Sequence, residues 1–233
     1  MLEATTEALR VAIDTGNLNT VRTLVTDEPV LLQTIIRPGP NRNYRPLTEA
    51  AVECQLEILR FLIDSGCDVN EDANYPMFRT ALYERCIPAL EMLVSRGADI
   101  DGVWDDYGPP IIASCEGMAP ACMKWLLDHG ARIDGTARGA TREVHWSAVA
   151  HAASFYKWRP ELLRLVLERG GDLNSRGVRG DTALHAAARR GDAAGVEWLL
   201  QHGADARAEN ASGRRAIEVT RNKKIHALLE AAA

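Results

Sequence analysis

One short pattern recurs along the chain, an amphipathic run of apolar residues that ends in a glycine. Successive runs end at glycines that are 31, 33, 40 and 33 residues apart. A nearly constant period of this length is the signature of a repeat architecture, in which each unit buries its apolar face against its neighbours only. The step of 40 residues indicates an insertion in one unit. The glycines are Gly66, Gly97, Gly130, Gly170 and Gly203.

Each run predicts an amphipathic helix. In the last full copy, Val196, Leu199 and Leu200 fall at helical spacing and Gly203 follows them. Helices commonly end with a residue in the left-handed conformation, which glycine adopts without a Cβ clash. A second short helix is expected upstream of each run, and its clearest copy spans residues 182–188.

The segment TALHAAARRGDAAGVEWLLQHGAD, residues 182–205, closely resembles an ankyrin repeat, whose usual pattern is TPLHxAAxxGxxxxVxxLLxxGAD. Residues 46–70 are similar, with Thr48 in place of the usual histidine, and weaker copies start near Met77 and Pro110. The resemblance covers nearly the whole chain. It implies an all-α solenoid of about seven helix-turn-helix units with β-hairpin or finger connections.

We expect a single domain, 1–233, divided into seven units. Their approximate boundaries are 1–38 (an N-terminal cap), 39–71, 72–104, 105–138, 139–177 (with the insertion), 178–210 and 211–233 (a C-terminal cap). Two segments depart from the period. Residues 35–45 contain Pro-Gly-Pro, which predicts an exposed loop, and residues 135–159 contain the insertion, with the inner helix of that unit at 147–154.

The resemblance also implies where a partner binds, because fingertips and the exposed side of the inner helices form a concave surface in this family. Aromatic and arginine side chains are enriched among interface hot spots. For Trp104 and Tyr107 the alternative is packing on the neighbouring finger. The expected partner contacts are Glu53, Tyr75, Glu84, Trp104, Asp105, Asp106, Tyr107, Glu116, Arg138, Arg142, Trp146, Tyr156, Trp158, Arg176, Arg179 and Arg189.

The charge is uneven along the chain. The net charge of −5 argues against a general nucleic-acid binder. Residues 46–130 carry −10 and residues 131–233 carry +5, so we expect a protein partner, such as a toxin or effector, with a basic surface facing the acidic central repeats. No window has the length of apolar sequence that a membrane span needs. The N-terminus has no secretory pattern, and the five cysteines show no paired spacing, which favours a reduced cytoplasmic setting.

No sequence motif for catalysis, phosphate binding or cofactor binding is present, so we expect no enzyme activity and no cofactor. The resemblance gives His185 a structural role as a brace between repeats. The function favoured is a non-catalytic protein-interaction module. One alternative, drawn from the likeness to stand-alone bacterial ankyrin proteins, is an immunity protein or inhibitor that occludes a toxin's active site. Another is a metal or enzymatic site at the 135–159 insertion, around His145 and His151.

Overall fold

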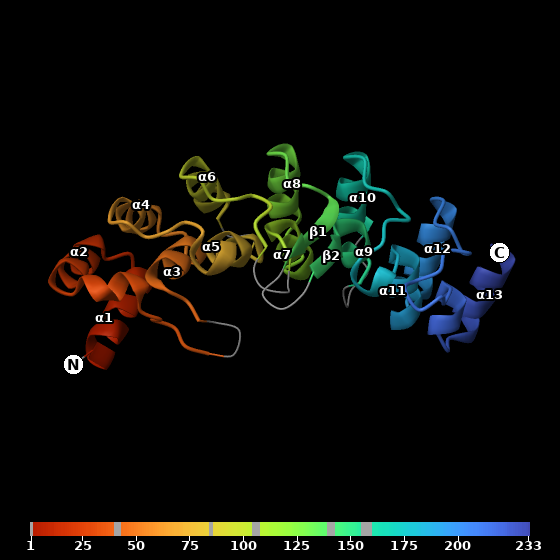
Figure 1. Ribbon diagram of the computed structural model, residues 1–233, viewed down its shortest axis with the longest axis horizontal. Helices are drawn as coiled ribbons and strands as arrows, with labels where there is room; N and C mark the ends of the chain where they lie inside the picture. Colours follow the sequence, from red (N-terminus) through yellow and green to blue (C-terminus); the bar gives the residue numbers. More distant parts are fainter. Residues whose placement is uncertain (1, 40–42, 84–85, 104–107, 139–142, 155–159) are drawn as a thin grey trace.

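The computed structural model describes the chain except for residues 1, 40–42, 84–85, 104–107, 139–142 and 155–159. The side chains of residues 2, 72–74, 136–138 and 143–144 are also outside the description. The described part forms an elongated, mostly helical solenoid in which two rows of helices run side by side from one terminus to the other (Figure 1). The sequence prediction of an all-α solenoid of helix pairs is therefore confirmed.

Seven consecutive helix pairs build the solenoid, with an inner helix and then an outer helix in each. They are α1 (Leu2–Asp14) with α2 (Leu18–Asp27), α3 (Pro46–Val52) with α4 (Leu56–Asp64), α5 (Glu71–Ala81) with α6 (Ile87–Ser95), α7 (Pro110–Glu116) with α8 (Pro120–Asp128), α9 (Ala148–Ala152) with α10 (Pro160–Glu168), α11 (Ala183–Arg190) with α12 (Ala193–Gln201), and the short helix η3 (Ala216–Val219) with α13 (Lys223–Ala231). Two further 3-10 turns, η1 (Pro29–Gln33) and η2 (Val178–Gly180), lie in the connections.

The repeated glycines end the outer helices as predicted. Gly66, Gly97, Gly130, Gly170 and Gly203 all have φ between +86° and +97°. The residue after each glycine donates its backbone N–H to a carbonyl five positions earlier, which satisfies the last turn of the helix. This shared ending gives every unit the same exit direction, so successive units stack in register.

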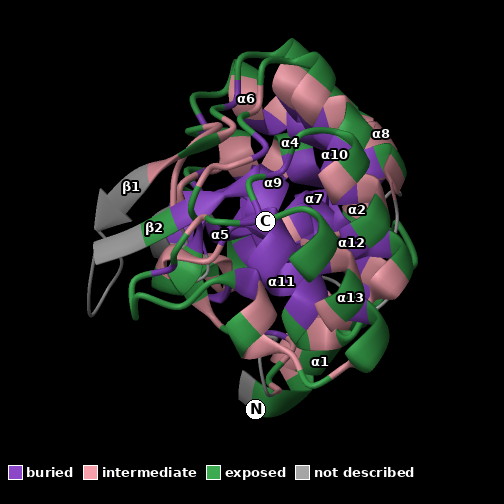
Figure 2. Ribbon diagram, turned by 90° about the vertical axis from the view of Figure 1, so that its right-hand side faces the viewer, coloured by how far each residue is buried: buried purple, intermediate pink, exposed green. Residues whose placement is uncertain are grey.

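One apolar core runs along the whole solenoid. Buried side chains from Leu9 in α1 to Leu229 in α13 form a single cluster, and the buried residues lie where the helices of each pair face their neighbours (Figure 2). Inner helices pack on the next inner helices and outer helices on the next outer helices. The stability of each unit therefore depends on its neighbours.

His185 joins two neighbouring units, as the resemblance implied. Its Nε2 lies 2.8 Å from the carbonyl oxygen of Arg214, and its Nδ1 lies 2.8 Å from the hydroxyl of Thr182. A carbonyl cannot donate, so Nε2 carries the proton and Nδ1 accepts from Thr182. The ring is fully buried, and both of its nitrogens are satisfied.

The segment 35–45 is not the wholly exposed loop that the sequence predicts. Ile36 and Tyr44 are buried, and a two-residue antiparallel bridge joins Arg37 to Tyr44. Ile36 packs into the apolar core, and Tyr44 packs with Val52 and Tyr75. The segment is thereby fixed to the start of the solenoid.

Cysteine pairing also differs from the sequence expectation. The Sγ atoms of Cys54 and Cys86 form a disulfide, which joins the α3–α4 turn to the start of α6. Cys54 has a φ of +58°, the backbone conformation that Gly16 and Gly191 adopt in the equivalent turns. The two residues belong to successive units, so their spacing carries no local signal for pairing.

Candidate functional site

A hollow lies on the inner-helix side of the solenoid, between the fifth and sixth helix pairs. Its volume is about 260 Å³, and it opens between α9 and α11 with η2 along one edge. The two-stranded finger β1 (Asp134–Arg138) and β2 (Glu143–Ser147) leads into it, with Asp134 paired to Ser147 and Gly135 to Trp146. Figure 2 shows this hairpin projecting from the body of the solenoid. Two successive repeats therefore form the walls of one recess.

The walls combine apolar and basic side chains. Ala150 of α9, Ala186 of α11 and the exposed Val178 of η2 contribute apolar surface. Three arginines, Arg179, Arg189 and Arg190, line the same space. A recess with apolar walls and a few convergent polar groups is the usual form of a binding site.

The arginines of α11 are fixed by local partners. Nη2 of Arg189 donates to Oδ2 of Asp181 at 2.6 Å, and the other oxygen of Asp181 accepts from Nδ2 of Asn210 at 2.8 Å. Nη1 of Arg190 donates to the carbonyl of Ala153 at 3.0 Å. Burial lowers the pKa of Arg190, which remains a cation because its ordinary pKa is far above neutrality. The two guanidiniums are held at the edge of the hollow rather than free to move into solvent.

Arg179 differs from both. It lies at the fingertip in η2 with φ 65° and ψ 14°, which is the left-handed region, and its side chain is exposed. Within the described part of the chain, no carboxylate or other acceptor pairs with its guanidinium. Its carbonyl accepts from the backbone N–H of Ala211 at 3.1 Å, so the tip is tied to the next finger. An arginine in this conformation costs about 1–2 kcal/mol relative to glycine.

A weak polar contact joins a residue of the hollow to the preceding inner helix. Nε2 of His151, a lining residue on α9, lies 3.4 Å from Oε1 of Glu116 on α7. This contact gives His151 and Glu116 a mutual partner, in place of the metal site considered for His145 and His151. Among the described residues, no three His, Cys, Asp or Glu side chains come together as metal ligands.

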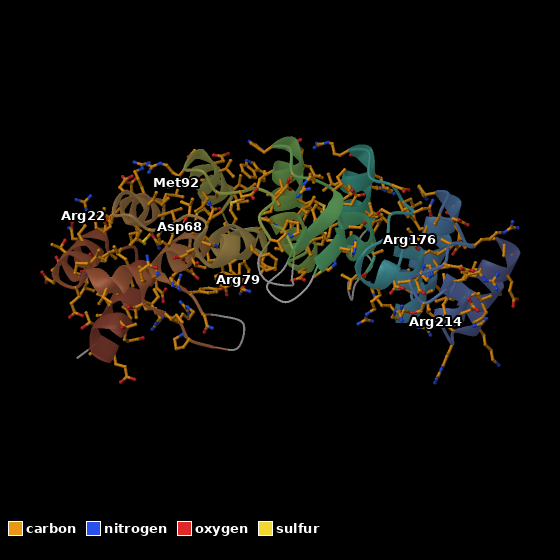
Figure 3. All side chains as sticks on the ribbon, viewed as in Figure 1. Arg22, Asp68, Arg79, Met92, Arg176 and Arg214 are labelled. Carbon is orange, nitrogen blue, oxygen red and sulfur yellow. A yellow bond between two sulfur atoms is a disulfide. The ribbon has the colours of Figure 1, made fainter. Side chains whose placement is uncertain are left out.

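The residues expected to contact a partner divide into four groups, of which the last is the buried pair Tyr75 and Trp146. Arg179 and Arg189 line the hollow, and Arg176 is exposed on the same connecting segment between α10 and α11 (Figure 3). Glu53 lies half-buried at the end of α3, and Glu116 faces His151. Several others fall outside the described residues: Glu84, Trp104, Asp105, Asp106, Tyr107, Arg142, Tyr156, Trp158 and the side chain of Arg138.

Two of the expected partner contacts, Tyr75 and Trp146, are buried and are not exposed finger residues. Tyr75 is 3% exposed, because α5 begins at Glu71 rather than near Met77 and carries Tyr75 against Tyr44. Trp146 is 3% exposed, because its ring packs across the hairpin beside Gly135 and under the guanidinium of Arg132. Trp146 therefore supplies part of a wall, with little ring surface left for a partner.

Tyr75 belongs to a separate buried cluster that the sequence reasoning missed. Arg79 of α5 is 7% exposed and lies over the rings of Tyr44, Tyr75 and Tyr83, at 5.1, 5.8 and 5.9 Å from their centroids. Its Nε donates to the Tyr44 hydroxyl at 2.8 Å. Burial raises the pKa of Tyr44 to about 12, so the hydroxyl stays protonated. The helical spacing of Tyr75, Arg79 and Tyr83 was the signal for this cluster.

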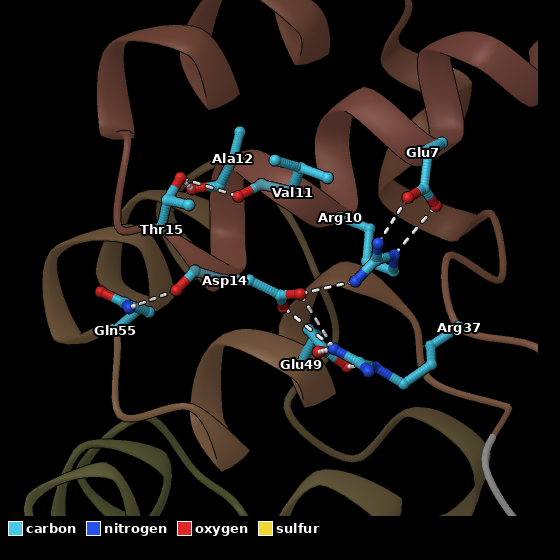
Figure 4. A network of polar contacts seen from close by, with 9 residues as sticks. All are labelled: Glu7, Arg10, Val11, Ala12, Asp14, Thr15, Arg37, Glu49 and Gln55. Carbon is cyan, nitrogen blue, oxygen red and sulfur yellow. Dashed lines mark hydrogen bonds and ion pairs between the residues drawn. The ribbon is translucent and has the colours of Figure 1, made fainter.

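Buried charges reduce the acidity that the central repeats present. Glu49 and Glu71 are both buried, Glu49 pairing with Arg37 and Glu71 lying 3.9 Å from Arg45. Figure 4 shows Glu49 within a network that also joins Asp14 and Arg10. These carboxylates fix the 35–45 segment to α1, α3 and α5, and are unavailable to a partner.

No helix in the described part of the chain is both long enough and apolar enough to cross a membrane.

The fold and its recess define a helical-repeat protein that presents an inner, finger-bearing face. A family model for ankyrin repeats (three copies) matches residues 111–210 and 149–229, which together exceed half of the chain. The chain therefore belongs to the ankyrin-repeat family.

Curated relatives are similar over part of the sequence. An ankyrin repeat and KH domain-containing protein of Caenorhabditis briggsae is 28% identical over 172 residues, which are 69% of this chain and 6% of that protein. Ankyrin repeat and SOCS box protein 11 of Danio rerio is 34% identical over 119 residues, which are 48% of this chain and 36% of that protein. The chain thus spans well under half the length of these relatives. All are eukaryotic, and they give no support to a bacterial type.

Solved structures share the architecture. The ankyrin repeat domain of human ASB11 superposes with a TM-score of 0.72 at 22% identity, over 97% of both chains. The ankyrin repeat domain of Bcl-3 superposes with a TM-score of 0.67 at 23% identity, over 96% of this chain and 97% of that one. At these identities the likeness establishes the fold alone.

Proposed function

We propose that this chain is a non-catalytic protein-interaction module that holds one protein partner along its inner face. The observation that carries the proposal is the hollow between α9 and α11, which two successive repeats build from apolar walls and three arginines. A fingertip arginine in a strained conformation without a partner among the described residues adds to this support.

The partner's chemistry is expected to differ along the solenoid. The sequence count favours a basic partner surface opposite the acidic central repeats, but Glu49 and Glu71 within that count are buried. The three arginines that line the hollow between the fifth and sixth repeats favour an acidic surface at that place. A single partner in contact with both regions would need charges of opposite sign on its two halves. The narrower reading as an inhibitor or immunity protein gains no support from the relatives, so the proposal is limited to binding.

Affinity capture with matched variants tests this proposal. The chain is immobilised as wild type, as Arg189→Glu on the inner face, and as Arg164→Glu, which makes the same charge change at an exposed position of the outer helix α10. Extract from the source cells is passed over each. We expect a partner retained by wild type and Arg164→Glu and depleted by Arg189→Glu. Equal retention by all three variants would contradict binding through this face.

A further inference from the structure

We infer that the hollow between α9 and α11 receives a glutamate side chain from an extended acidic segment of the protein partner. The inference rests on the proposed function, and it names the chemical group of the partner that the arginine-lined hollow recognises. Three features of the hollow carry it. Its lining has an excess of positive charge, one of its arginines, Arg179, makes no ion pair among the described residues, and its apolar walls enclose a volume of side-chain dimensions.

The charge balance of the lining favours an anion. Three arginines line the hollow, whereas Asp181 is the one carboxylate among the lining residues. Asp181 already accepts from Arg189 and Asn210, so its charge is engaged. Arg190 reaches a neutral carbonyl, that of Ala153, and lies 3.9 Å from Asp192. An incoming carboxylate would therefore meet guanidinium groups whose charge the protein leaves only partly compensated.

Arg179 is the arginine of the hollow that is available to pair with such an anion. The two arginines of α11 are held by hydrogen bonds, so they offer a fixed edge. Arg179 lines the same hollow from η2 and makes no ion pair within the described ranges. The turn that carries it is rigid, because Gly180 N–H donates to the carbonyl of Gly177 at 2.9 Å and Ala211 N–H donates to the carbonyl of Arg179. The backbone of the fingertip is thus already positioned, and binding has to order only the Arg179 side chain.

The size of the hollow selects a side chain rather than a folded element. A volume of about 260 Å³ is smaller than the pockets that enclose drug-sized ligands. Ala150, Ala186 and Val178 contribute apolar surface to the same lining as the arginines. A glutamate has two methylene groups for contact with this apolar surface and a carboxylate at the end for bidentate pairing with arginine.

The same lining argues against nucleic acid as the occupant. Single-stranded nucleic acids are held by aromatic faces on which bases stack, in addition to basic groups. Trp146 is the aromatic residue among the lining side chains that are described, and it is 3% exposed. Its ring is covered by the hairpin and by Arg132, so Trp146 offers no face on which a base could stack.

Peptide binding by fluorescence anisotropy tests the inference. The probes are labelled peptides of alternating glutamate and serine, aspartate and serine, or glutamine and serine, with an oligothymidylate as the competing anion. We expect the glutamate peptide to bind about fourfold more tightly than the aspartate peptide, because one further methylene is buried. The glutamine peptide is expected not to bind. The oligothymidylate is expected to compete poorly with the glutamate peptide.

Variants locate the binding to the hollow. Arg179→Gln is expected to weaken binding of the glutamate peptide about tenfold, and Arg164→Gln on the outer helix to leave the affinity unchanged. Arg179→Lys is expected to retain only part of the affinity, because lysine keeps the charge but not the bidentate geometry. Because Arg179 is exposed and has no partner among the described groups, its replacement leaves the fold intact. Amide resonances of Ala150, Gly177 and Ala186 are expected to shift with the glutamate peptide.

Equal affinity of wild type and Arg179→Gln, or stronger binding of oligothymidylate than of peptide, would overturn the inference. Such results are distinguishable from failure of the proposed function. If capture still selects a partner that depends on Arg189 while the glutamate peptide does not bind, the module binds proteins but recognises them by other chemistry. If neither a partner nor a peptide depends on the inner face, both proposals fall.

Discussion

The guanidinium of Arg37, in the segment before α3, donates from Nε to Oε2 of the buried Glu49 carboxylate at 2.9 Å. Nη2 of Arg37 also contacts Asp14 of α1 at 3.0 Å, so a single side chain ties the 35–45 segment to two helices. The Glu49 side chain is 1% exposed. A buried carboxylate with one cation and a second acid beside it makes the stability of this end of the solenoid dependent on pH.

The first prediction concerns that pH dependence. Burial raises the pKa of Glu49 from 4.5 to about 7, and Arg37 opposes the rise. The folded state then binds the proton more tightly than the unfolded state, so the stabilising contribution is fully present below about pH 4.5 and is lost as the pH rises through about 7. Denaturant unfolding at about pH 5 and pH 8 should show wild type losing roughly 2–3 kcal/mol more than Glu49→Gln across that window.

Glu7→Gln in the same network is the matched control. Its hydrogen bond with Arg10 lowers the pKa of Glu7, so Glu7 stays ionised across the window and the variant should keep the wild-type slope. Parallel pH profiles for wild type and Glu49→Gln would show that Arg37 keeps Glu49 ionised throughout.

The repeat architecture could be predicted from sequence because its determinants are local. A helix-ending glycine such as Gly203 needs only a positive φ, and the motif around His185 fixes its own hydrogen bonds within one repeat and the next. The repeat pattern also predicted that Arg179 and Arg189 lie on the inner face, because their positions within the repeat are fixed locally. It did not indicate Asp181, whose role depends on Asn210 in the following finger.

Exposure of the aromatic residues could not be predicted in this way. Tyr75 is buried because Tyr44, in the 35–45 segment, reaches its ring at 5.9 Å between centroids. Trp146 is buried because its strand pairs across the insertion with Gly135, where a side chain would meet the indole at 3.2 Å. Both outcomes depend on pairings between segments whose register the repeat pattern leaves undefined. A tyrosine or tryptophan in an irregular connection is therefore a weak indicator of a binding surface.

A second prediction concerns the His185 brace. His185→Ala removes a fully buried ring and two hydrogen bonds, and it leaves the carbonyl of Arg214 without that donor. The free energy of unfolding should fall by about 2–4 kcal/mol. His202→Ala, at an exposed ring stacked on Trp198, should cost about 1 kcal/mol or less. Similar losses for the two variants in urea titrations would remove the case for His185 as an inter-repeat brace.

A third prediction concerns the disulfide. Cys54 and Cys86 are 32 positions apart, and closing a loop of that length restricts the unfolded chain by about 3–4 kcal/mol. Dithiothreitol should lower the unfolding midpoint of wild type and leave Cys86→Ser unaffected. The remaining thiols should not contribute to the response, since Cys67, Cys115 and Cys122 are buried, and burial raises the pKa of Cys67 to about 12. A midpoint that does not respond to reductant would contradict a disulfide in the native protein.

A fourth prediction separates stability from binding at Arg179. Glycine adopts a φ of 65° without a Cβ clash, so Arg179→Gly should raise the free energy of unfolding by about 0.5–1 kcal/mol after the greater flexibility of the unfolded chain is counted. Arg176→Gly is the matched control. Arg176 is also exposed, but it is not among the residues with positive φ, so the same substitution should be neutral or destabilising by up to about 1 kcal/mol.

The two measurements together decide why an arginine occupies this position. If Arg179→Gly is more stable than wild type and also loses the glutamate peptide, the chain retains a strained residue at the cost of stability because its guanidinium binds. If the variant is less stable, the backbone strain is offset by contacts of the arginine side chain within the chain. The fingertip would then be a structural element of the solenoid, and the inner face would have to bind its partner without Arg179.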